Sequence, residues 1–224
     1  MTDTVIPVRL GIVSAYLLKG RNGDCAIVDC GIPGSEKKIL RVMEKAGIGR
    51  NQLRLIIITH GHGDHMGSSS ALREITGAGT VIHRLDSDII RTGRSPKIQP
   101  ISRKGKLFSR FVGDEVKPFH PYEPEIIIEG EFSLHEYGIE GRIIETPGHT
   151  GGSVSVVLDD GNVFAGDLIM GGMAVRGKPG LPMYAESVDA VKDSIHKITG
   201  LNPQKIYLGH GGPFSLDEVK ERFG

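Results

Sequence analysis

The feature that most constrains this chain is the sequence HGHGDH at residues 60–65, which directly follows the apolar run 53–59. Three imidazoles and a carboxylate on six residues crowd together in the folded state, where cationic imidazoles would repel one another. A metal ion removes this conflict because it binds neutral imidazole, and glycine at alternate positions lets the short loop fold back so that the side chains converge. The sequence therefore predicts a strand that ends at a metal-binding loop. The candidate ligands in this loop are His60, His62, Asp64 and His65.

Three further candidates follow later apolar runs, and each has glycine neighbours: His149, Asp167 and His210. Taken singly, each of them has an alternative interpretation as an ordinary turn residue. Taken together with the loop at 60–65, they complete a set of five histidines and two aspartates. A donor set of nitrogen and oxygen alone suits zinc, iron or manganese better than copper(I) or calcium.

Composition places the chain among soluble globular proteins. Its 27 basic and 27 acidic residues give zero net charge, so nothing in the overall charge attracts nucleic acid or an anionic membrane. The longest aliphatic run, residues 55–58, is far too short to span a bilayer, and the first residues lack the pattern of a secretory signal. Two cysteines exclude a disulfide scaffold. We therefore expect a cytoplasmic protein with one domain over residues 1–224, and neither nucleic acid nor membrane as a partner.

Hydrophobic periodicity indicates many short strands joined by glycine-rich loops, with a few amphipathic helices. The expected strands are 5–18, 25–29, 53–59, 80–83, 126–129, 131–135, 142–146, 153–158, 162–165 and 205–209. Helices are expected over 35–46, 68–76 and 187–198, and the sequence Ser215-Leu-Asp-Glu218 is a capping box that opens a terminal helix.

The segment 84–124 has little hydrophobic periodicity, and we expect it to be an irregular insertion. Eight basic residues lie between Arg91 and Lys117, against only two acidic ones, Asp114 and Glu115. Long irregular connections inside compact domains are often lids or binding loops. One interpretation is a lid or wall beside the site, in which Phe108 and Phe111 supply apolar contacts and the charges favour an anionic small-molecule substrate. The alternative is a solvated loop without a role in binding.

The ordered pattern of HxHxDH, then GHT, then GD, then GH resembles the metallo-β-lactamase superfamily over nearly the whole chain. This resemblance implies an α/β (α+β) fold, a four-layer αββα sandwich with a two-metal site at one edge of its two sheets. It assigns His60, His62 and His149 to one ion, Asp64, His65 and His210 to the other, and Asp167 to a bridging position. Asp29 matches an early Asp-x-Gly turn of the family and would support the histidine loop.

The same resemblance implies a metal-dependent hydrolase. A hydroxide held between the two ions would attack the substrate, the ions would polarise the oxygen that gains charge, and Asp64 would orient the nucleophile as well as bind metal. The residues look most like those of the glyoxalase II and lactonase group, which implies cleavage of an ester, thioester or lactone of a small molecule. Two divalent ions are expected, with zinc first and iron or manganese as alternatives.

Differences from the residue patterns of other branches of the superfamily narrow the choice of function. Asp167 stands where true β-lactamases of this fold usually have other residues, and the diiron flavoproteins have Glu at the position of His62. The extra phosphodiesterase motifs of the tRNA-processing nucleases are not found. About fourteen residues follow His210, too few for the helical extension that holds glutathione in glyoxalase II.

Two other functions stay open. One is a persulfide dioxygenase-like oxidoreductase with a single iron, and the other is a metal-stabilised binding module without catalysis. The substrate, the native metal and the oligomeric state are open as well.

Overall fold

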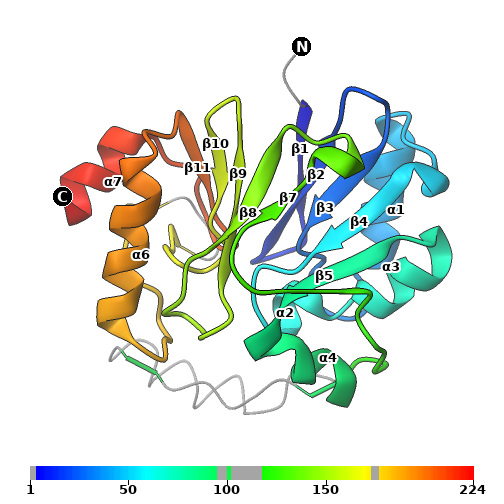
Figure 1. Ribbon diagram of the computed structural model, residues 1–224, viewed down its shortest axis with the longest axis horizontal. Helices are drawn as coiled ribbons and strands as arrows, with labels where there is room; N and C mark the ends of the chain where they lie inside the picture. The colour runs from blue at the N-terminus through cyan, green and yellow to red at the C-terminus, as the bar shows by residue number, and fades with distance from the viewer. Residues whose placement is uncertain (1–3, 95–99, 102–117, 173–176) are drawn as a thin grey trace.

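Two β-sheets face each other in the computed structural model, and helices cover their outer faces (Figure 1). The structure describes residues 4–94, 100–101, 118–172 and 177–224. The first sheet contains β1 (Thr4–Arg9), β2 (Ser14–Lys19), β3 (Cys25–Val28), β4 (Leu53–Ile57), β5 (Gly79–His83) and β6 (Ile126–Ile128). The second contains β7 (Phe132–Ser133), β8 (Gly141–Glu145), β9 (Val154–Leu158), β10 (Asn162–Phe164) and β11 (Lys205–Tyr207).

Strand direction brings several loops to one edge of the first sheet. Its strands lie in sequence order; β1, β2 and β3 are antiparallel neighbours, while β3, β4, β5 and β6 run parallel. In the second sheet the order is β11-β10-β9-β8-β7, and only the β10–β11 pair is parallel. Because parallel strands end at the same edge, the segments after β3, β4 and β5 lie side by side there.

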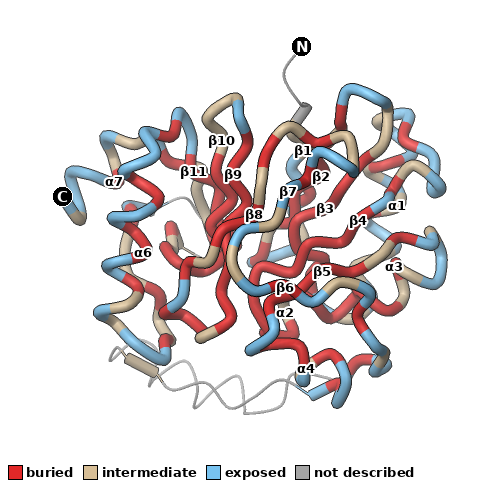
Figure 2. Tube along the Cα trace, viewed as in Figure 1, coloured by how far each residue is buried: buried red, intermediate tan, exposed pale blue. Residues whose placement is uncertain are grey.

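Alternating side chains divide the interior into three apolar layers. In β3, Ile27 faces the helices while Val28 faces the second sheet, and Ile56 and Ile57 in β4 divide in the same way. A third layer lies between the second sheet and its helices, where Val157 of β9 packs with residues of the helical layer. Figure 2 shows these buried layers in red along both sheets. The expected four-layer αββα sandwich is therefore confirmed.

The helices predicted over 35–46, 68–76 and 187–198 and the terminal helix all form. The helices in the described part of the chain are α1 (Glu36–Lys45), α2 (Gly63–Met66), α3 (Ser69–Thr76), α4 (Ser87–Thr92), α6 (Val188–Gly200) and α7 (Leu216–Phe223). Ile39 and Met43 form the buried face of α1, and the predicted capping box opens α7 with reciprocal bonds between Ser215 and Glu218. None of these helices has the length and apolar content needed to cross a bilayer.

Some expected elements were wrong. The strand predicted over 131–135 is limited to β7, because the chain turns into a 3-10 helix at His135–Tyr137. The single strand predicted over 5–18 is the hairpin β1–β2. The one-turn helix α2 was not predicted, since four residues are too few to show a helical period.

The start of the segment 84–124 is not irregular. A 3-10 helix at Arg84–Asp86 leads into α4, which buries Ile90 and ends at Gly93 with a left-handed backbone (φ 67°). Arg91, counted among the basic residues of a lid, instead pairs with Glu123 at 2.8 Å and Asp88 at 2.7 Å. The other basic residues from Lys97 to Lys117, with Phe108 and Phe111, lie outside the described residues, and so does the predicted lid.

Candidate metal centre

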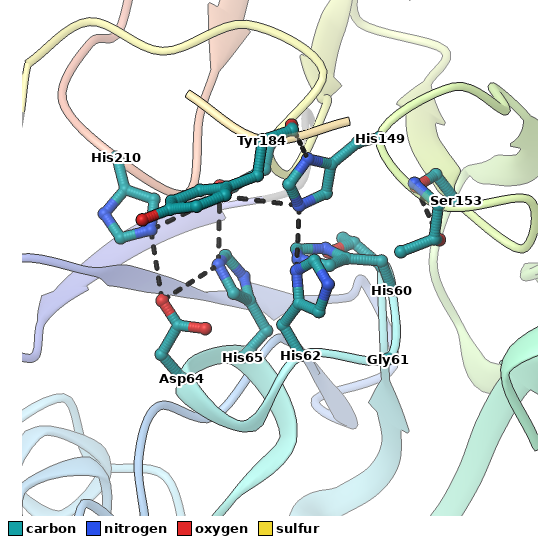
Figure 3. A network of polar contacts seen from close by, with 12 residues as sticks. His60, Gly61, His62, Asp64, His65, His149, Ser153, Tyr184 and His210 are labelled. Carbon is teal, nitrogen blue, oxygen red and sulfur yellow. Dashed lines mark hydrogen bonds and ion pairs between the residues drawn. The ribbon is translucent and has the colours of Figure 1, made fainter. Parts of the chain in front are cut away.

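The seven predicted ligands lie together where the two sheets meet at one edge (Figure 3). The first sheet supplies the loop after β4 and the helix α2, which carry His60, His62, Asp64 and His65. The second sheet supplies His149, Asp167 and His210, which follow β8, β10 and β11 respectively. Four segments that are far apart in the sequence therefore converge on one place, and each arrives at the end of a strand.

The seven side chains form two groups with a carboxylate between them. In the first group, His60, His62 and His149, the possible ligand atoms lie within 4.8 Å of one another, and His149 Nε2 is 2.9 Å from His62 Nδ1. The second group is Asp64, His65 and His210, in which Asp64 Oδ2 is 3.2 Å from His210 Nε2.

Asp167 contacts both groups. Its Oδ1 lies 3.3 Å from His65 Nε2, and its Oδ2 lies 3.4 Å from His210 Nε2 and 3.8 Å from His149 Nε2. No side chain fits at nearby Gly209, because a Cβ there would lie 2.4 Å from both Asp167 Oδ1 and His65 Cε1.

Hydrogen bonds at the outer ring nitrogens set the direction of the histidines. His149 Nδ1 donates to the backbone carbonyl of Tyr184 and His210 Nδ1 to that of Ile12, both at 2.8 Å. Since a carbonyl can only accept, each of these rings carries a hydrogen on Nδ1 and turns its Nε2 inward. His65 Nδ1 bonds to Asp29 Oδ2 at 2.8 Å, which fixes a third ring in the same way.

Buried polar atoms at the centre lack hydrogen bonds. His60 Nε2, His65 Nε2 and Asp167 Oδ1 are inaccessible to solvent and have no hydrogen-bond partner in the described part of the chain. His65 Nε2 and Asp167 Oδ1 face each other at 3.3 Å as an ion pair. Unsatisfied buried polar atoms are rare because each costs about 1–3 kcal/mol. A nitrogen and oxygen donor set that points inward without partners is the surrounding that a transition-metal ion requires.

Electrostatics favour neutral imidazoles in the first group. Burial, with a smaller contribution from the neighbouring His149, lowers the pKa of His62 to about 3. Burial also holds the pKa of His60 well below its usual value and lowers that of His149. Neutral imidazole is the form that binds a metal ion.

In the second group, ionised carboxylates decide the pKa values. Burial acts to lower the pKa of His65 and His210, but the charges of Asp167 and Asp64 outweigh it and raise both. Burial acts to raise the pKa of Asp64 and Asp167, but the imidazoles around them outweigh it and lower both. The two aspartates therefore stay ionised, which gives the centre the negative charge that attracts cations.

Asp29 supports the histidine loop, as predicted. It sits at the end of β3 with a left-handed backbone (φ 59°) that few residues other than glycine adopt. Its carboxylate accepts bonds from the backbone N–H and the hydroxyl of Thr59 and from His65 Nδ1. Thr59 in turn contacts His60 Nδ1 at 3.0 Å, so one buried carboxylate orients two histidines.

Three neighbours of the centre were not predicted from the sequence. Ile12 and Tyr184 act through backbone carbonyls, which any residue type could supply, so no pattern of side chains marks them. The ring of Tyr184 also extends over the centre toward His210 (Figure 3). The third is Asp86, a buried carboxylate that contacts the loop at 60–65. The feature of the sequence that could have indicated Asp86 is a carboxylate three residues after an apolar strand.

The remaining histidines lie outside the centre, as expected. Those at positions 120, 135 and 196 are exposed. His83 is buried and bonds to Glu145 at 2.9 Å.

Comparison with known proteins identifies the family of this chain. Residues 8–210 match the family model of the metallo-β-lactamase superfamily. A probable metallo-hydrolase of Bacillus subtilis, YflN, is 30% identical over 207 residues, which are 84% of this chain and 76% of that protein. A probable metallo-hydrolase of Methanocaldococcus jannaschii, MJ0888, is 27% identical over 88% of this chain and 87% of that one. The chain belongs to the metallo-β-lactamase superfamily.

Solved structures show the same architecture. The crystal structure of TTHA1623 in a di-iron-bound form superposes with a TM-score of 0.71 and 25% identity, and it covers 98% of both chains. The archaeal superfamily protein ST1585 from Sulfolobus tokodaii superposes with a TM-score of 0.69 and 21% identity, over 98% of this chain and 84% of that one.

Proposed function

We propose that this protein is a hydrolase that uses two divalent metal ions to cleave an ester, thioester or lactone of a small molecule. The observation that carries the proposal is the set of inward-facing donors at the candidate metal centre. His60 Nε2, His65 Nε2 and Asp167 Oδ1 are buried without hydrogen bonds, and the rings of His149 and His210 are held so that Nε2 points inward.

The two groups and Asp167 would hold the ions. His60, His62 and His149 would bind one, Asp64, His65 and His210 the other, and Asp167 would lie between both because it contacts histidines of each group. When bound, a pair of divalent ions lowers the pKa of water toward neutrality and polarises the carbonyl of the substrate. The ionised Asp167 offsets part of the repulsion between two such cations.

Asp64 is the residue we propose for orienting the nucleophile. Its side chain is 32% exposed, whereas those of His65, Asp167 and His210 are at most 8% exposed. Its pKa is lowered against the effect of burial by His65 and His210, so the carboxylate is ready to accept a hydrogen bond from the attacking water. Replacing Asp64 by Asn should reduce kcat by about 10²–10⁴-fold, the usual contribution of a positioned acid–base group.

Zinc is our proposed metal, and iron is the alternative with direct support. The similar protein TTHA1623 was solved in a di-iron-bound form, and nitrogen and oxygen donors suit either ion. Iron would also allow a persulfide dioxygenase-like function. Both cysteines are free and buried, which fits a reducing compartment such as the cytoplasm.

The test is metal analysis of the purified protein followed by an activity panel. Protein reconstituted with zinc or with iron would be assayed on ester, thioester, lactone and phosphodiester substrates, and for oxygen uptake with a persulfide. We expect turnover of at least one carbonyl substrate without oxygen uptake. Oxygen uptake by the iron form, with no hydrolysis of any carbonyl substrate, would favour the oxidoreductase instead.

A further inference from the structure

Asp86 is a buried carboxylate beside the first group that the proposed chemistry does not use. It is 4% exposed and belongs to the 3-10 helix that follows β5. Its Oδ2 accepts a bond from the backbone N–H of Gly61 at 2.7 Å and a second from the hydroxyl of Thr150 at 2.8 Å. Both bonds are buried, so solvent does not replace them.

These two bonds join the two loops that carry the first group. Gly61 lies between His60 and His62, and Thr150 directly follows His149. A single oxygen therefore fixes the distance between the loop of the first sheet and the loop of the second. Thr150 is itself held by Ser153, whose Oγ accepts from the Thr150 backbone N–H and contacts its hydroxyl, each at 2.9 Å.

Asp86 fits closely against the same loops. A Cβ on Gly152 would lie 2.6 Å from Asp86 Cγ, and a Cβ on Gly61 would lie 3.2 Å from Asp86 Cβ and Cγ. Glycine at these positions leaves the space that the carboxylate occupies. This close fit therefore fixes the position of Asp86 relative to both loops.

Asp29 is the counterpart of Asp86 on the other side of the histidine loop. Asp29 follows β3 and Asp86 follows β5, while the histidine loop follows β4, which lies between them. Asp29 bonds to His65 of the second group, whereas Asp86 bonds to the part of the loop that carries the first group. The loop is thus held from both sides. Asp86 contacts the part that carries the first group, whereas Asp29 contacts His65 of the second group and, through Thr59, also His60 of the first.

We propose that Asp86 is a positioning residue that sets the affinity of the first group for its metal ion. The inference rests on the proposed function, because it takes His60, His62 and His149 to hold an ion. Asp86 contacts none of these side chains and acts through the backbone of Gly61 and the hydroxyl of Thr150. Loss of its charge weakens two charge-assisted hydrogen bonds at once, which lets the two loops separate.

The test compares Asp86→Asn with Asp29→Asn. Metal-free wild type and both variants would be titrated with Co²⁺, followed by its visible absorption, and with Zn²⁺ by calorimetry. His62→Ala and His210→Ala would identify the absorption that belongs to each group. Residues that orient metal ligands typically contribute about 10–100-fold in affinity. We expect Asp86→Asn to weaken the first ion by that factor and leave the second within about twofold. Asp29→Asn should weaken both ions, because Asp29 bonds to His65 directly and reaches His60 through Thr59.

Thr150→Val is a second test of the proposal, and it leaves the Asp86 carboxylate in place. It removes one of the two bonds to Asp86, and we expect a smaller loss of affinity at the first group only. In the double variant with Asp86→Asn the two losses should not add, because they break the same link. Circular dichroism of the metal-free forms checks that each variant is folded. Should Asp86→Asn fail to fold, Thr150→Val decides the question, and unchanged affinity there would overturn the proposal.

The other results are equally decisive. Equal weakening of both ions in Asp86→Asn would show a general structural role and overturn the proposal, as would unchanged binding of the first ion. Wild type that binds no ion under any condition would overturn the proposed function, and this inference with it. Wild type that binds two ions, with both unaffected by Asp86→Asn, would leave the proposed function intact and reject this inference alone.

Discussion

At the scale of single residues, a large effect is expected for Asp167 because it contacts both groups of the candidate metal centre. Its carboxylate reaches His65, His149 and His210 within 3.8 Å. We expect Asp167→Ala to lower kcat/KM by at least about 10²–10³-fold, since the ions lose both a shared ligand and a neutralising charge. Steady-state kinetics on a verified substrate measures this.

A matched control is Asp189→Ala, which removes an aspartate that is 93% exposed on α6. It should leave both activity and fold unchanged. Asp167→Ala should likewise keep the circular dichroism of the wild type, because the three apolar layers do not depend on it. Unchanged turnover in Asp167→Ala would exclude this residue from the centre.

The two cysteines provide a second prediction at this scale. Cys25 and Cys30 are fully buried in the same apolar layer, although five residues along one regular strand would place them on opposite faces. The left-handed backbone of Asp29 ends the regular alternation between them. Burial raises the pKa of Cys25 to about 12 and that of Cys30 well above its usual value, so the reactive thiolate is scarce at pH 8.

We therefore expect both thiols to resist Ellman's reagent at pH 8 in the native protein and to react at once in guanidinium chloride. The absorbance of the released thiolate counts the reactive groups in each state. Rapid reaction of either thiol in the native protein would show that this layer opens to solvent.

At the scale of elements, helix α1 shows where sequence reasoning about caps fails. Ser35 precedes the helix in the position of an N-cap, but its side chain makes no capping bond. The bonds come from Ser68, whose Oγ accepts from the backbone N–H groups of Ser35 at 2.9 Å and Glu36 at 3.3 Å. Ser68 lies 33 residues away, so no local pattern could identify it.

Because Ser68 rather than Ser35 caps the helix, two similar substitutions should differ in their effect on stability. Ser68→Ala should lower the free energy of unfolding by about 0.5–2 kcal/mol, because it removes the side chain that caps the helix and bonds to the Ile32 carbonyl. Ser35→Ala should change it by less than about 0.5 kcal/mol, the usual range for a side chain without such a bond. Urea unfolding of the metal-free proteins measures both. A larger loss of unfolding free energy in Ser35→Ala would mean that the Ser35 side chain does cap the helix.

Helices and strands were predictable where apolar residues follow a regular pattern over a long enough stretch. Alternation in β3 and β4 and the buried face of α6 follow directly from the spacing of apolar residues. Short helices were not predictable: α2 has four residues, and α4 buries only Ser87 and Ile90. Their backbone is fixed by tertiary contacts, such as the bond from the Cys30 N–H to the His65 carbonyl, rather than by local periodicity.

The ligand positions of the centre were predictable for a related reason. Each predicted ligand follows an apolar strand and carries its chemistry in its own side chain, so the sequence displays it. The groups that orient the ligands are often backbone carbonyls, as at Ile12 and Tyr184, and these have no signature in the sequence.

At the scale of the whole molecule, the centre joins the two sheets, so metal binding should stabilise the fold. We expect about two divalent ions per chain by elemental analysis. An ion at a hundred times its dissociation constant adds about 2.7 kcal/mol to the free energy of unfolding. Removal of both ions should therefore lower the Tm by roughly 10 °C or more, given about 2–4 °C per kcal/mol for a chain of this size.

Thermal unfolding with and without a chelator measures this change, and adding the ions back should restore the Tm. Protein that saturates at one ion, with Asp64→Ala and His210→Ala both retaining it, would contradict a two-ion centre.

The bond between His210 Nδ1 and the Ile12 carbonyl spans 198 residues and has a consequence for synthesis. The histidine loop leaves the ribosome early, but its partners at 149, 167 and 210 emerge only later. A nascent chain can present at most part of the ligand set until residue 210 has returned to the first hairpin. Full loading of the proposed two-ion centre would thus be confined to chains whose early and late halves have met, and bound ions would mark the molecules that have finished folding.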